Sequence, residues 1–577
     1  MGGQLLWLLL GLTIITTASG GKRSISEECD PGDLKGLISF KGGIRMDASG
    51  RLAKWVGHSC CKWEGVSCNN ATGRVTEIHL PGFISTDDFV FQSQMEGWLS
   101  PSITFLTSLQ VLDLGGLTGL TGKIPPLIGH LQNLRKLHLY GNKLKGNSLT
   151  GHIPENVGEL QLLKELDLSD NFLCGEIPPS VNNLTTISVM YLDSNHLEGE
   201  IPFPSTFRQM PSLGFLRLQN NHLGGRIPPN FGYLVSLQRV SLANNKFEGA
   251  IPPSLANLEA LTELYLSGNK LSGLVPKSIG QLSHLILLSI SHNLIQGPLP
   301  DEMSALQNLQ TLDLSFNLLN LTSIPTWLAE LPSLSRLYLA GCGIKGQIPD
   351  FLRSTPSPIQ ELDLSVNHLT GGIPAWIGSL TQLYSLNLSR NYLVSNIPDS
   401  VADFQELGVL DLHSNKITSS LDQVFKIGNS FPDGSLTYID LSDNSFTTGI
   451  EQIGVGTQQR IEYLNLSHNL LEGQLPTSMG QLKALQSLDL SYNKLGFSLA
   501  EAIANLSILE TLKLQRNHFT GKIPVEFLNL KDLKDLDLSD NLLVGEIPAG
   551  KPLSDFPQSS FTGNKGLCGK PLSPCKS

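Results

Sequence analysis

Residues 163–173 read LKELDLSDNFL, and this phrase decides the fold. Its pattern, L-x-x-L-x-L-x-x-N-x-L, returns at Leu261–Leu271 and at Leu533–Leu543. We count 19 copies between residues 75 and 553, most of them 24 or 25 residues apart. A unit of this length cannot bury its own leucines, so the copies are expected to stack into one solenoid with a continuous core.

Within each copy, leucines alternate with variable residues, which predicts a short strand with one buried side. Stacked copies then place parallel strands on the concave face of the solenoid. Asparagine occupies the N position of the motif in 16 copies. At this turn its buried side-chain amide is expected to form hydrogen bonds with backbone groups of adjacent coils. Phe83, Leu117 and Cys342 replace it in the other three.

Most copies continue as G-x-I-P, followed by a short apolar stretch such as Pro253–Leu258. Glycine permits an unusual turn, and proline removes a backbone donor, so the strand is expected to end there. The apolar stretch predicts a helical turn on the convex side. These features together predict an α/β repeat solenoid.

Composition excludes several other classes of protein. The chain has 577 residues, of which 16% are charged, and its net charge is 40 − 51 = −11. Its mean hydropathy is +0.01, so it holds enough apolar surface to exclude wholesale disorder. The sequence shows no cluster of lysine and arginine, which argues against nucleic acid as a partner.

The N-terminus carries an apolar run, LLWLLLGLTIITT, at residues 5–17, followed by small residues at Ala18-Ser19-Gly20. This pattern predicts a secretory signal peptide over residues 1–20, although the preceding MGGQ lacks lysine and arginine. A membrane anchor is the alternative, but 13 apolar residues are short for a span of about 20. No later run reaches 18 apolar residues, so we expect no transmembrane segment in the mature chain.

The cysteines cluster near the two ends of the chain, at Cys29, Cys60, Cys61, Cys68, Cys568 and Cys575. Such clusters flanking an almost cysteine-free middle predict disulfide-stapled caps in an oxidising compartment. A zinc site is the alternative, and the absence of any CxxC pair argues against it. Of the two remaining cysteines, Cys342 occupies a structural position of the repeat and Cys174 is expected to be a free thiol.

The N-terminal segment CCKWEGVSC (residues 60–68) and the C-terminal segment GNKGLCGKPL (residues 563–572), together with the L-x-G-x-I-P repeats, resemble plant extracellular leucine-rich repeat proteins. The resemblance covers nearly the whole mature chain. It implies an N-terminal cap over 21–74, a solenoid over 75–553, and a C-terminal cap over 554–577. It also implies the disulfides Cys29–Cys60, Cys61–Cys68 and Cys568–Cys575.

No constellation typical of catalysis is present: the chain lacks a G-x-S-x-G elbow, an H-E-x-x-H motif and a phosphate-binding loop. Aspartate recurs at the central strand position, as at Asp313 and Asp363, where it is a frequent filler of this repeat. Histidines such as His196 and His222 are interpreted as solvated turn residues. We therefore expect no enzyme, no cofactor and no metal.

The exposed strand positions predict a ligand-binding surface on the concave face. Repeats 3 to 11 carry aromatic and basic residues of the kind that anchor interfaces. Strand propensity alone also favours tyrosine and phenylalanine at such positions, and this alternative stays open. The candidate residues are Lys136, His138, Tyr140, Tyr191, Phe215, Arg217, Arg239, Tyr265, Phe316, Arg336 and Tyr338.

N-glycosylation sequons add a second constraint on where a ligand binds. Two of them, Asn387 and Asn465, occupy the central outward strand position. Sugar at these sites would steer large ligands toward the N-terminal two-thirds of the concave face. The predicted glycosylation sites are Asn70, Asn183, Asn320, Asn387, Asn465 and Asn505.

The resemblance implies three functions for a secreted protein of the apoplast or cell wall. The first is recognition of a peptide or protein ligand on the concave face, together with a receptor kinase, in cell-surface signalling or defence. The second is inhibition of a cell-wall hydrolase such as polygalacturonase. The third is a structural or wall-associated scaffold, against which the irregular repeat spacing argues.

Overall fold

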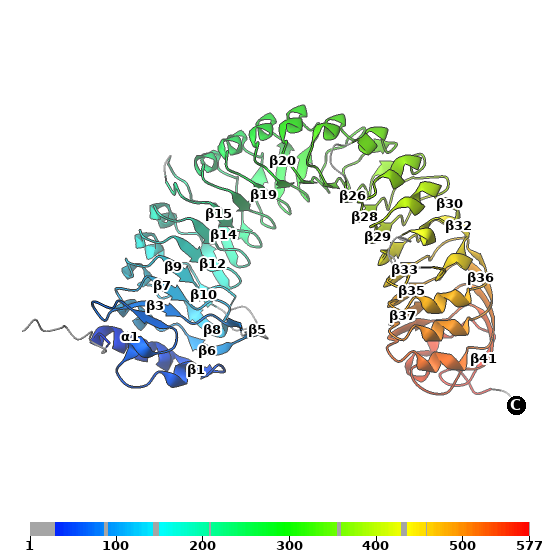
Figure 1. Cartoon of the computed structure of the whole chain (residues 1–577), viewed down its shortest axis with the longest axis horizontal. Helices are drawn as coiled ribbons and strands as arrows, with labels where there is room; N and C mark the ends of the chain where they lie inside the picture. The colour runs from blue at the N-terminus through cyan, green and yellow to red at the C-terminus, as the bar shows by residue number, and fades with distance from the viewer. Residues whose placement is uncertain are drawn as a thin grey trace, which may run out of the picture.

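The computed structural model describes residues 29–85, 90–141, 149–206, 209–354, 359–427, 435–456 and 458–575. The chain forms an open arch, with the N-terminal part at one foot and the C-terminal part at the other (Figure 1). The expected signal peptide over residues 1–20 lies outside the described residues. So does Asn142, the first of the expected buried asparagines.

One parallel sheet lines the inside of the arch. In the described part of the chain it has nineteen parallel strands in chain order, from β3 (Val75–His79) to β39 (Asp535–Asp537). In the middle of the arch, β19 (Glu263–Tyr265) pairs in register with β17 (Arg239–Ser241) and β21 (Leu287–Ser289). Each strand has a buried apolar residue, leucine in most of them, so the predicted solenoid and its concave sheet are confirmed.

Short helical turns cover the convex side, as the apolar stretches predicted. They are 3-10 helices, and η9 (Pro253–Asn257) is typical: Leu255 and Ala256 are its buried residues. Among the described residues, the one α-helix is α1 (Pro31–Gly43) in the N-terminal cap.

A second layer of short strands follows the closing asparagine of many coils. In the middle of the arch, this layer contains β18 (Glu248–Gly249), β20 (Lys270–Leu274) and β22 (Leu294–Gln296), which pair in parallel.

The closing asparagines tie each coil to the preceding one, as predicted. Asn269 shows the pattern: its Oδ1 accepts a hydrogen bond from the amide of Phe247 at 3.0 Å. Its Nδ2 donates to the carbonyl oxygens of Leu242 and Leu266, both at 3.0 Å, and of Ser267 at 3.2 Å. A buried amide is stable here because both ends of its side chain are satisfied by backbone groups.

Cys342 breaks this ladder. Its thiol lies 3.4 Å from the carbonyl oxygen of Leu314, and burial raises the pKa of the thiol to about 12. A thiol is a weak acceptor, so the backbone amide of Leu319 in the preceding coil lacks the side-chain acceptor that Phe247 has in Asn269. Among the described residues, Leu319 N–H has no hydrogen-bond acceptor.

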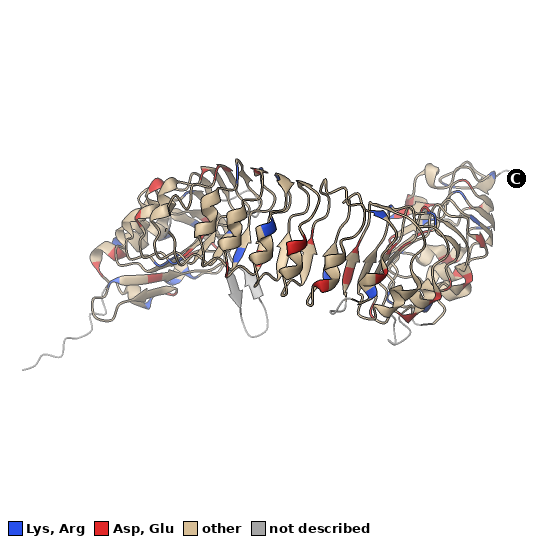
Figure 2. Ribbon diagram, turned by 90° about the horizontal axis from the view of Figure 1, so that it is seen from above, with Lys and Arg blue, Asp and Glu red and all other residues tan. Residues whose placement is uncertain are grey.

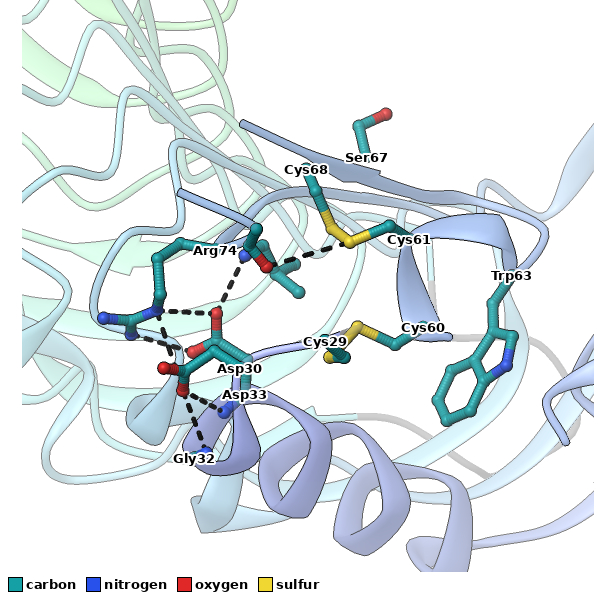
Figure 3. Close-up of a disulfide and its surroundings, with 12 residues drawn as sticks. Cys29, Asp30, Gly32, Asp33, Cys60, Cys61, Trp63, Ser67, Cys68 and Arg74 are labelled. Carbon is teal, nitrogen blue, oxygen red and sulfur yellow. Dashed lines mark hydrogen bonds and ion pairs between the residues drawn. A yellow bond between two sulfur atoms is a disulfide. The ribbon is translucent and has the colours of Figure 1, made fainter. Parts of the chain in front are cut away.

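The N-terminal cap is held by two disulfides and a buried ion pair (Figure 3). Cys29 bonds Cys60, and Cys61 bonds Cys68, as the resemblance implied. The fully buried carboxylate of Asp33, in α1, accepts hydrogen bonds from Arg74 Nη2 at 2.8 Å and from the amide of Val75 at 2.8 Å. This contact joins the cap helix to the first strand of the solenoid.

Local chemistry explains why α1 begins where it does. Asp30 precedes the helix, and its Oδ1 accepts hydrogen bonds from the amides of Gly32 at 2.9 Å and Asp33 at 3.2 Å. Pro31 occupies the first helical position, where its missing N–H costs nothing.

At the other end, Cys568 bonds Cys575, the third implied disulfide. Cys174 is a free thiol, as expected, and Cys342 is a buried free thiol at its structural position in the repeat. In the part of the chain that the structure describes, no helix combines the length and the apolar character needed to cross a membrane.

Candidate ligand-binding surface on the concave face

Two rows of side chains project from the concave sheet, because residues one and three of each three-residue strand flank its buried apolar residue. In the first row, Phe215 pairs with Arg239, and Arg239 with Glu263. In the second row, Tyr191 pairs with Arg217 of the next strand. Adjacent parallel strands lie about 4.8 Å apart, so each row is a ladder of neighbouring side chains.

Nine of the eleven predicted ligand-binding residues stand on these rows. The strands are β9 (Lys136–His138), β13 (Val189–Tyr191), β15 (Phe215–Arg217), β17, β19 and β24 (Arg336–Tyr338). The nine residues are Lys136, His138, Tyr191, Phe215, Arg217, Arg239, Tyr265, Arg336 and Tyr338.

The other two, Tyr140 and Phe316, lie beyond the ends of their strands, so their expected strand positions are wrong. Tyr140 follows β9 and covers Gly115, where an added Cβ would meet its ring at 2.2 Å. Phe316 has φ of 54° in the turn after β23 (Thr311–Asp313), and its ring stacks on His292 at 4.5 Å. The repeat pattern alone does not show where a three-residue strand stops.

Two units on the surface each join an arginine and a tyrosine to one glutamate. In the first, Arg239 on the preceding strand forms an ion pair with Glu263. Glu263 Oε2 also accepts a hydrogen bond from Tyr265 OH at 3.0 Å. The second unit uses β26 (Glu361–Asp363): Arg336 Nε lies 3.1 Å from Glu361 Oε1, and Tyr338 OH donates to Glu361 Oε2. We call these the two Arg–Glu–Tyr units.

The glutamates of these units hold both partners in place. Burial and the adjacent Glu263 raise the pKa of Tyr265, and burial and Glu361 likewise raise that of Tyr338, so both phenols stay protonated. The tyrosines and arginines of the two units were predicted from the sequence, whereas the two glutamates were not. The signal was present, because Glu263 and Glu361 stand at the same outward strand position as Arg239 and Arg336 in the repeat.

Arg217 forms a third fixed group. Its guanidinium lies 4.8 Å from the ring centroid of Tyr191, and its Nη2 donates to Asp193 Oδ2 at 3.0 Å. Burial raises the pKa of Asp193 to about 6, although Arg217 acts in the opposite direction. The guanidinium side chain is still 39% exposed, so it can meet a ligand while it is held from behind.

Lys136 and His138 share one carboxylate near the N-terminal end of the surface. Lys136 Nζ lies 2.8 Å from Glu165 Oε1, and His138 Nε2 lies 3.1 Å from Glu165 Oε2. Most of the predicted basic residues are therefore neutralised by carboxylates of neighbouring coils. The surface thus offers oriented polar groups and aromatic faces, and its net positive field is small.

The C-terminal half of the concave face holds an aromatic pair that sequence analysis missed. The rings of Tyr438 and Tyr463, on β31 (Tyr438–Asp440) and β33 (Tyr463–Asn465), stack at 4.5 Å with an interplanar angle of 4°. Between Tyr338 and Tyr438 lies a hollow of about 290 Å³ whose floor includes Ser385 and Val409. The hollow exists because small side chains follow Glu361 in the first row.

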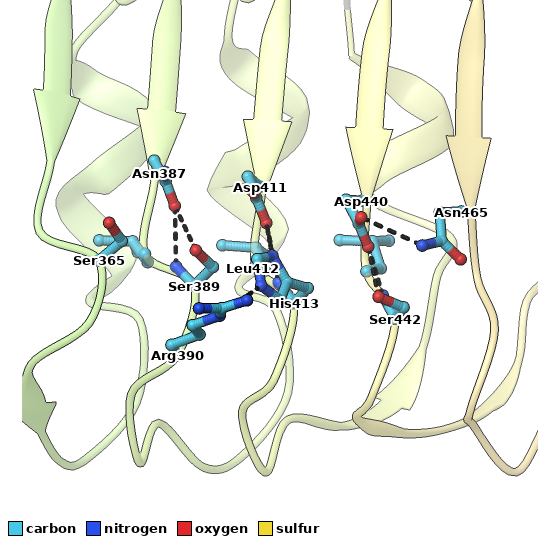
Figure 4. Close-up of polar contacts among 12 residues, drawn as sticks. Ser365, Asn387, Ser389, Arg390, Asp411, Leu412, His413, Asp440, Ser442 and Asn465 are labelled. Atoms are coloured by element: carbon cyan, nitrogen blue, oxygen red, sulfur yellow. Dashed lines mark hydrogen bonds and ion pairs between the residues drawn. The ribbon is translucent and has the colours of Figure 1, made fainter.

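Two carboxylates and one amide at the strand ends border this hollow: Asp363, Asp411 and Asn387. Figure 4 shows Asn387 and Asp411 on adjacent strands. Asp363 accepts from the amide of Ser365 at 2.9 Å, and Asp411 Oδ1 lies 2.6 Å from His413 Nδ1. Burial raises the pKa of both carboxyl groups. Asn387 stands between them in the same row, and its Oδ1 accepts from Ser389 Oγ at 2.7 Å.

The sequons differ in how they are placed. Asn387 and Asn465 are half-buried on concave strands, as their positions in the repeat predicted. Asn465 Nδ2 donates to Asp440 Oδ2 at 3.1 Å. The other four asparagines are exposed: Asn70, Asn183, Asn320 and Asn505.

Charged residues of both signs are scattered along the arch (Figure 2). Exposed ion pairs such as Lys277–Glu302, with 3.0 Å between Nζ and Oε1, lie on the convex helices and add little stability. Neither sign dominates one foot of the arch, which agrees with the small net charge of −11.

Profiles of known families match most of the arch. A leucine-rich repeat region matches residues 205–449, and a leucine-rich repeat N-terminal domain matches residues 30–69. Further leucine-rich repeat profiles match residues 434–495, 162–184 and 509–530.

Three curated proteins are similar over shorter stretches. The DNA damage-repair/toleration protein DRT100 of Arabidopsis thaliana is 38% identical over 21% of this chain, and a polygalacturonase inhibitor of Vitis vinifera is 32% identical over 24%. Receptor-like protein EIX1 of Solanum lycopersicum is 31% identical over 22%. The matched stretches span 34%, 38% and 13% of these relatives, respectively, so the chain aligns with a minor part of each.

Solved structures match over most of the chain. The ectodomain of the Arabidopsis thaliana receptor kinase GASSHO1/SCHENGEN3, in complex with CASPARIAN STRIP INTEGRITY FACTOR 2, is 34% identical with a TM-score of 0.65. That match covers 83% of this chain and 58% of the other. The ectodomain of the Arabidopsis receptor kinase HAESA, in complex with an IDA peptide hormone ligand, is 28% identical with a TM-score of 0.61 and covers 94% and 99%.

The repeats, the stapled caps and these matches agree on one class. The chain is a leucine-rich repeat protein, and it is similar to plant receptor-like proteins, receptor-kinase ectodomains and polygalacturonase inhibitors.

Proposed function

We propose that this protein is an extracellular recognition protein that binds a peptide or protein ligand on its concave face and acts in cell-surface signalling or defence with a receptor kinase. The observation that carries the proposal is the pair of Arg–Glu–Tyr units in the middle of the concave sheet. Solved ectodomains of the same fold, including that of HAESA with its peptide hormone, support the ligand class.

The units favour binding because their side chains are already ordered. Each tyrosine and arginine is held by a glutamate, so little rotamer freedom remains to be lost when a ligand docks. Tyrosine and arginine are also the residues that contribute most to interfaces when they are well packed. We propose binding as the role of this surface, because its tyrosines and arginines are recognition groups.

The experiment is affinity capture with the secreted, glycosylated protein from plant apoplastic and membrane extracts, read by quantitative mass spectrometry. A second bait carries Arg217→Ala and Tyr265→Ala, and a third carries Lys277→Ala on the convex side. A receptor kinase or peptide lost with the second bait and kept with the third supports the proposal. Equal capture by all three baits places the binding site elsewhere.

A second function, inhibition of a cell-wall hydrolase such as polygalacturonase, is favoured by the similarity to the grape polygalacturonase inhibitor. Its distinguishing result in the same experiment is enrichment of a wall hydrolase with no kinase. Added protein would then reduce the hydrolysis of polygalacturonate by the captured enzyme.

A further inference from the structure

The second layer of strands is divided into several short sheets, and one of its interruptions lies in the middle of the arch, after β22. Strand β22 pairs with β20 on one side, but on the other it makes only an isolated bridge between Gln296 and Leu318. The layer resumes at β25 (Lys345–Gly346) and β27 (His368–Leu369). The interruption lies beside Leu319. Within the described part of the chain, the amide of Leu319 has no ladder acceptor, because position 342 holds cysteine instead of asparagine.

A hollow of about 610 Å³ opens between the two coils at this interruption. One wall is Gln296, Gly297 and Pro298, and the other is the segment 318–323. Leu318 is 51% exposed and Leu294, on the neighbouring strand, is 46% exposed. An incompletely paired strand beside exposed leucines is a surface that proteins normally cover, because it invites association.

Asn320 stands within the lining of this hollow and begins the sequon Asn320-Leu321-Thr322. Both Asn320 and Thr322 are exposed. The side-chain amide makes one long contact, from Nδ2 to the carbonyl oxygen of Leu318 at 3.5 Å, so little holds the nitrogen that would carry a sugar.

The lining has the mixed chemistry that a sugar ring presents. Pro298 and Leu318 offer apolar surface to the C–H face of a ring, whereas Gln296 and Ser323 offer polar groups to its hydroxyls. A sugar attached at Asn320 begins inside the hollow, so its docking costs little additional freedom.

We propose that Asn320 carries an N-linked glycan whose first sugars lie in this hollow and cover the interruption of the second strand layer. The glycan replaces, as a cover, the strand pairing that the chain does not make there. The proposal concerns stability and solubility and does not depend on the ligand of the concave face.

The chain supplies a matched control at Asn183, which begins the same tripeptide, Asn183-Leu184-Thr185. Asn183 is also exposed, at the end of η7 (Pro179–Asn183). In that region the second layer is continuous, since β12 (Phe172–Glu176) pairs with β14 (His196–Gly199). A glycan at Asn183 therefore has no interruption to cover.

The test uses the full-length protein secreted from plant cells. Glycopeptide mass spectrometry is expected to find Asn320 occupied. Thr322→Ala removes the sequon but keeps Asn320, whose φ of 46° suits asparagine, and Thr185→Ala is the control. Amide hydrogen exchange of residues 294–297 and 318–323 and binding of an apolar dye are then compared.

We expect Thr322→Ala to speed exchange in these two segments and to increase dye binding, and Thr185→Ala to change neither. Trimming the wild-type glycan to its first sugar is expected to preserve protection, because that sugar is the one in the hollow. A bare Asn320 in the secreted protein overturns the proposal. Equal exchange and dye binding in the two variants also overturns it.

Discussion

The asparagine ladder offers the sharpest test of how the fold is held together, through the change Asn269→Cys. The substitution introduces cysteine, the residue found at position 342, into a coil that normally has the ladder asparagine. Cysteine is a small side chain that leaves no large cavity, so the effect reports the lost hydrogen bonds. Cysteine neither donates to three carbonyl groups nor accepts well from the amide of Phe247.

The free-energy cost of the substitution depends on which backbone groups lose their only hydrogen-bond partner. The carbonyl oxygens of Leu242 and Leu266 keep a second donor in Asn245 and Asn293, at 3.2 and 3.0 Å. The carbonyl oxygen of Ser267 keeps the amide of Asn244 at 2.8 Å. Only the buried amide of Phe247 is left unsatisfied, which costs about 1–3 kcal/mol.

Hydrogen exchange is the suitable assay, because a solenoid opens locally as well as globally. A cost of about 1–3 kcal/mol corresponds to exchange of the Phe247 amide that is about 5- to 150-fold faster. The control is the amide of Leu223, which donates to Asn245 at 3.0 Å and keeps that partner. Unchanged exchange at Phe247 would refute the reasoning that the ladder stabilises the coils.

Three further predictions concern other parts of the molecule. Arg74→Ala leaves the buried carboxylate of Asp33 without its ion-pair partner and is expected to destabilise the N-terminal cap by about 3–5 kcal/mol. Limited proteolysis measures the effect. The control is Lys54→Ala, which removes an exposed ion pair and is expected to have little effect. Because burial raises the pKa of Asp193 from 3.8 to about 6, its stabilising contribution is complete below pH 3.8 and is lost as the pH rises through about 6. Thermal unfolding of Asp193→Asn between pH 4 and pH 7 is therefore expected to depend less on pH than that of the wild type, and an unchanged slope would contradict this. Cys342→Asn is expected to slow hydrogen exchange of the Leu319 amide by restoring its acceptor. Unchanged exchange would show that the cysteine is not the cause of the interruption in the second layer.

The fold was predictable because its signal is repeated along the chain. Alternating leucines fixed which side of each strand is buried, and the cap motifs implied the three disulfides that the structure contains. The role of the asparagine ladder was also predictable, since a buried amide at a turn must bond backbone groups.

The binding surface was predictable only in part. Phe316 was misplaced because the repeat shows where a strand begins more clearly than where it ends. Glu263 and Glu361 were missed because their ion pairs join them to arginines 24 and 25 residues away, which meet them only when the coils stack. The hollow beside Asn320 was missed because its two walls, Gln296–Pro298 and residues 318–323, meet only when the coils stack.

The central claim is that the concave Arg–Glu–Tyr units bind the ligand, and one measurement tests it most directly. The affinity of the captured ligand is measured by biolayer interferometry for the wild type, Tyr265→Ala, Tyr338→Ala and the convex control Lys277→Ala. Each tyrosine change is expected to weaken binding by about tenfold or more, as loss of an interface anchor does, and the control to leave it unchanged. Undiminished affinity in both tyrosine variants, with each still folded, would contradict the account.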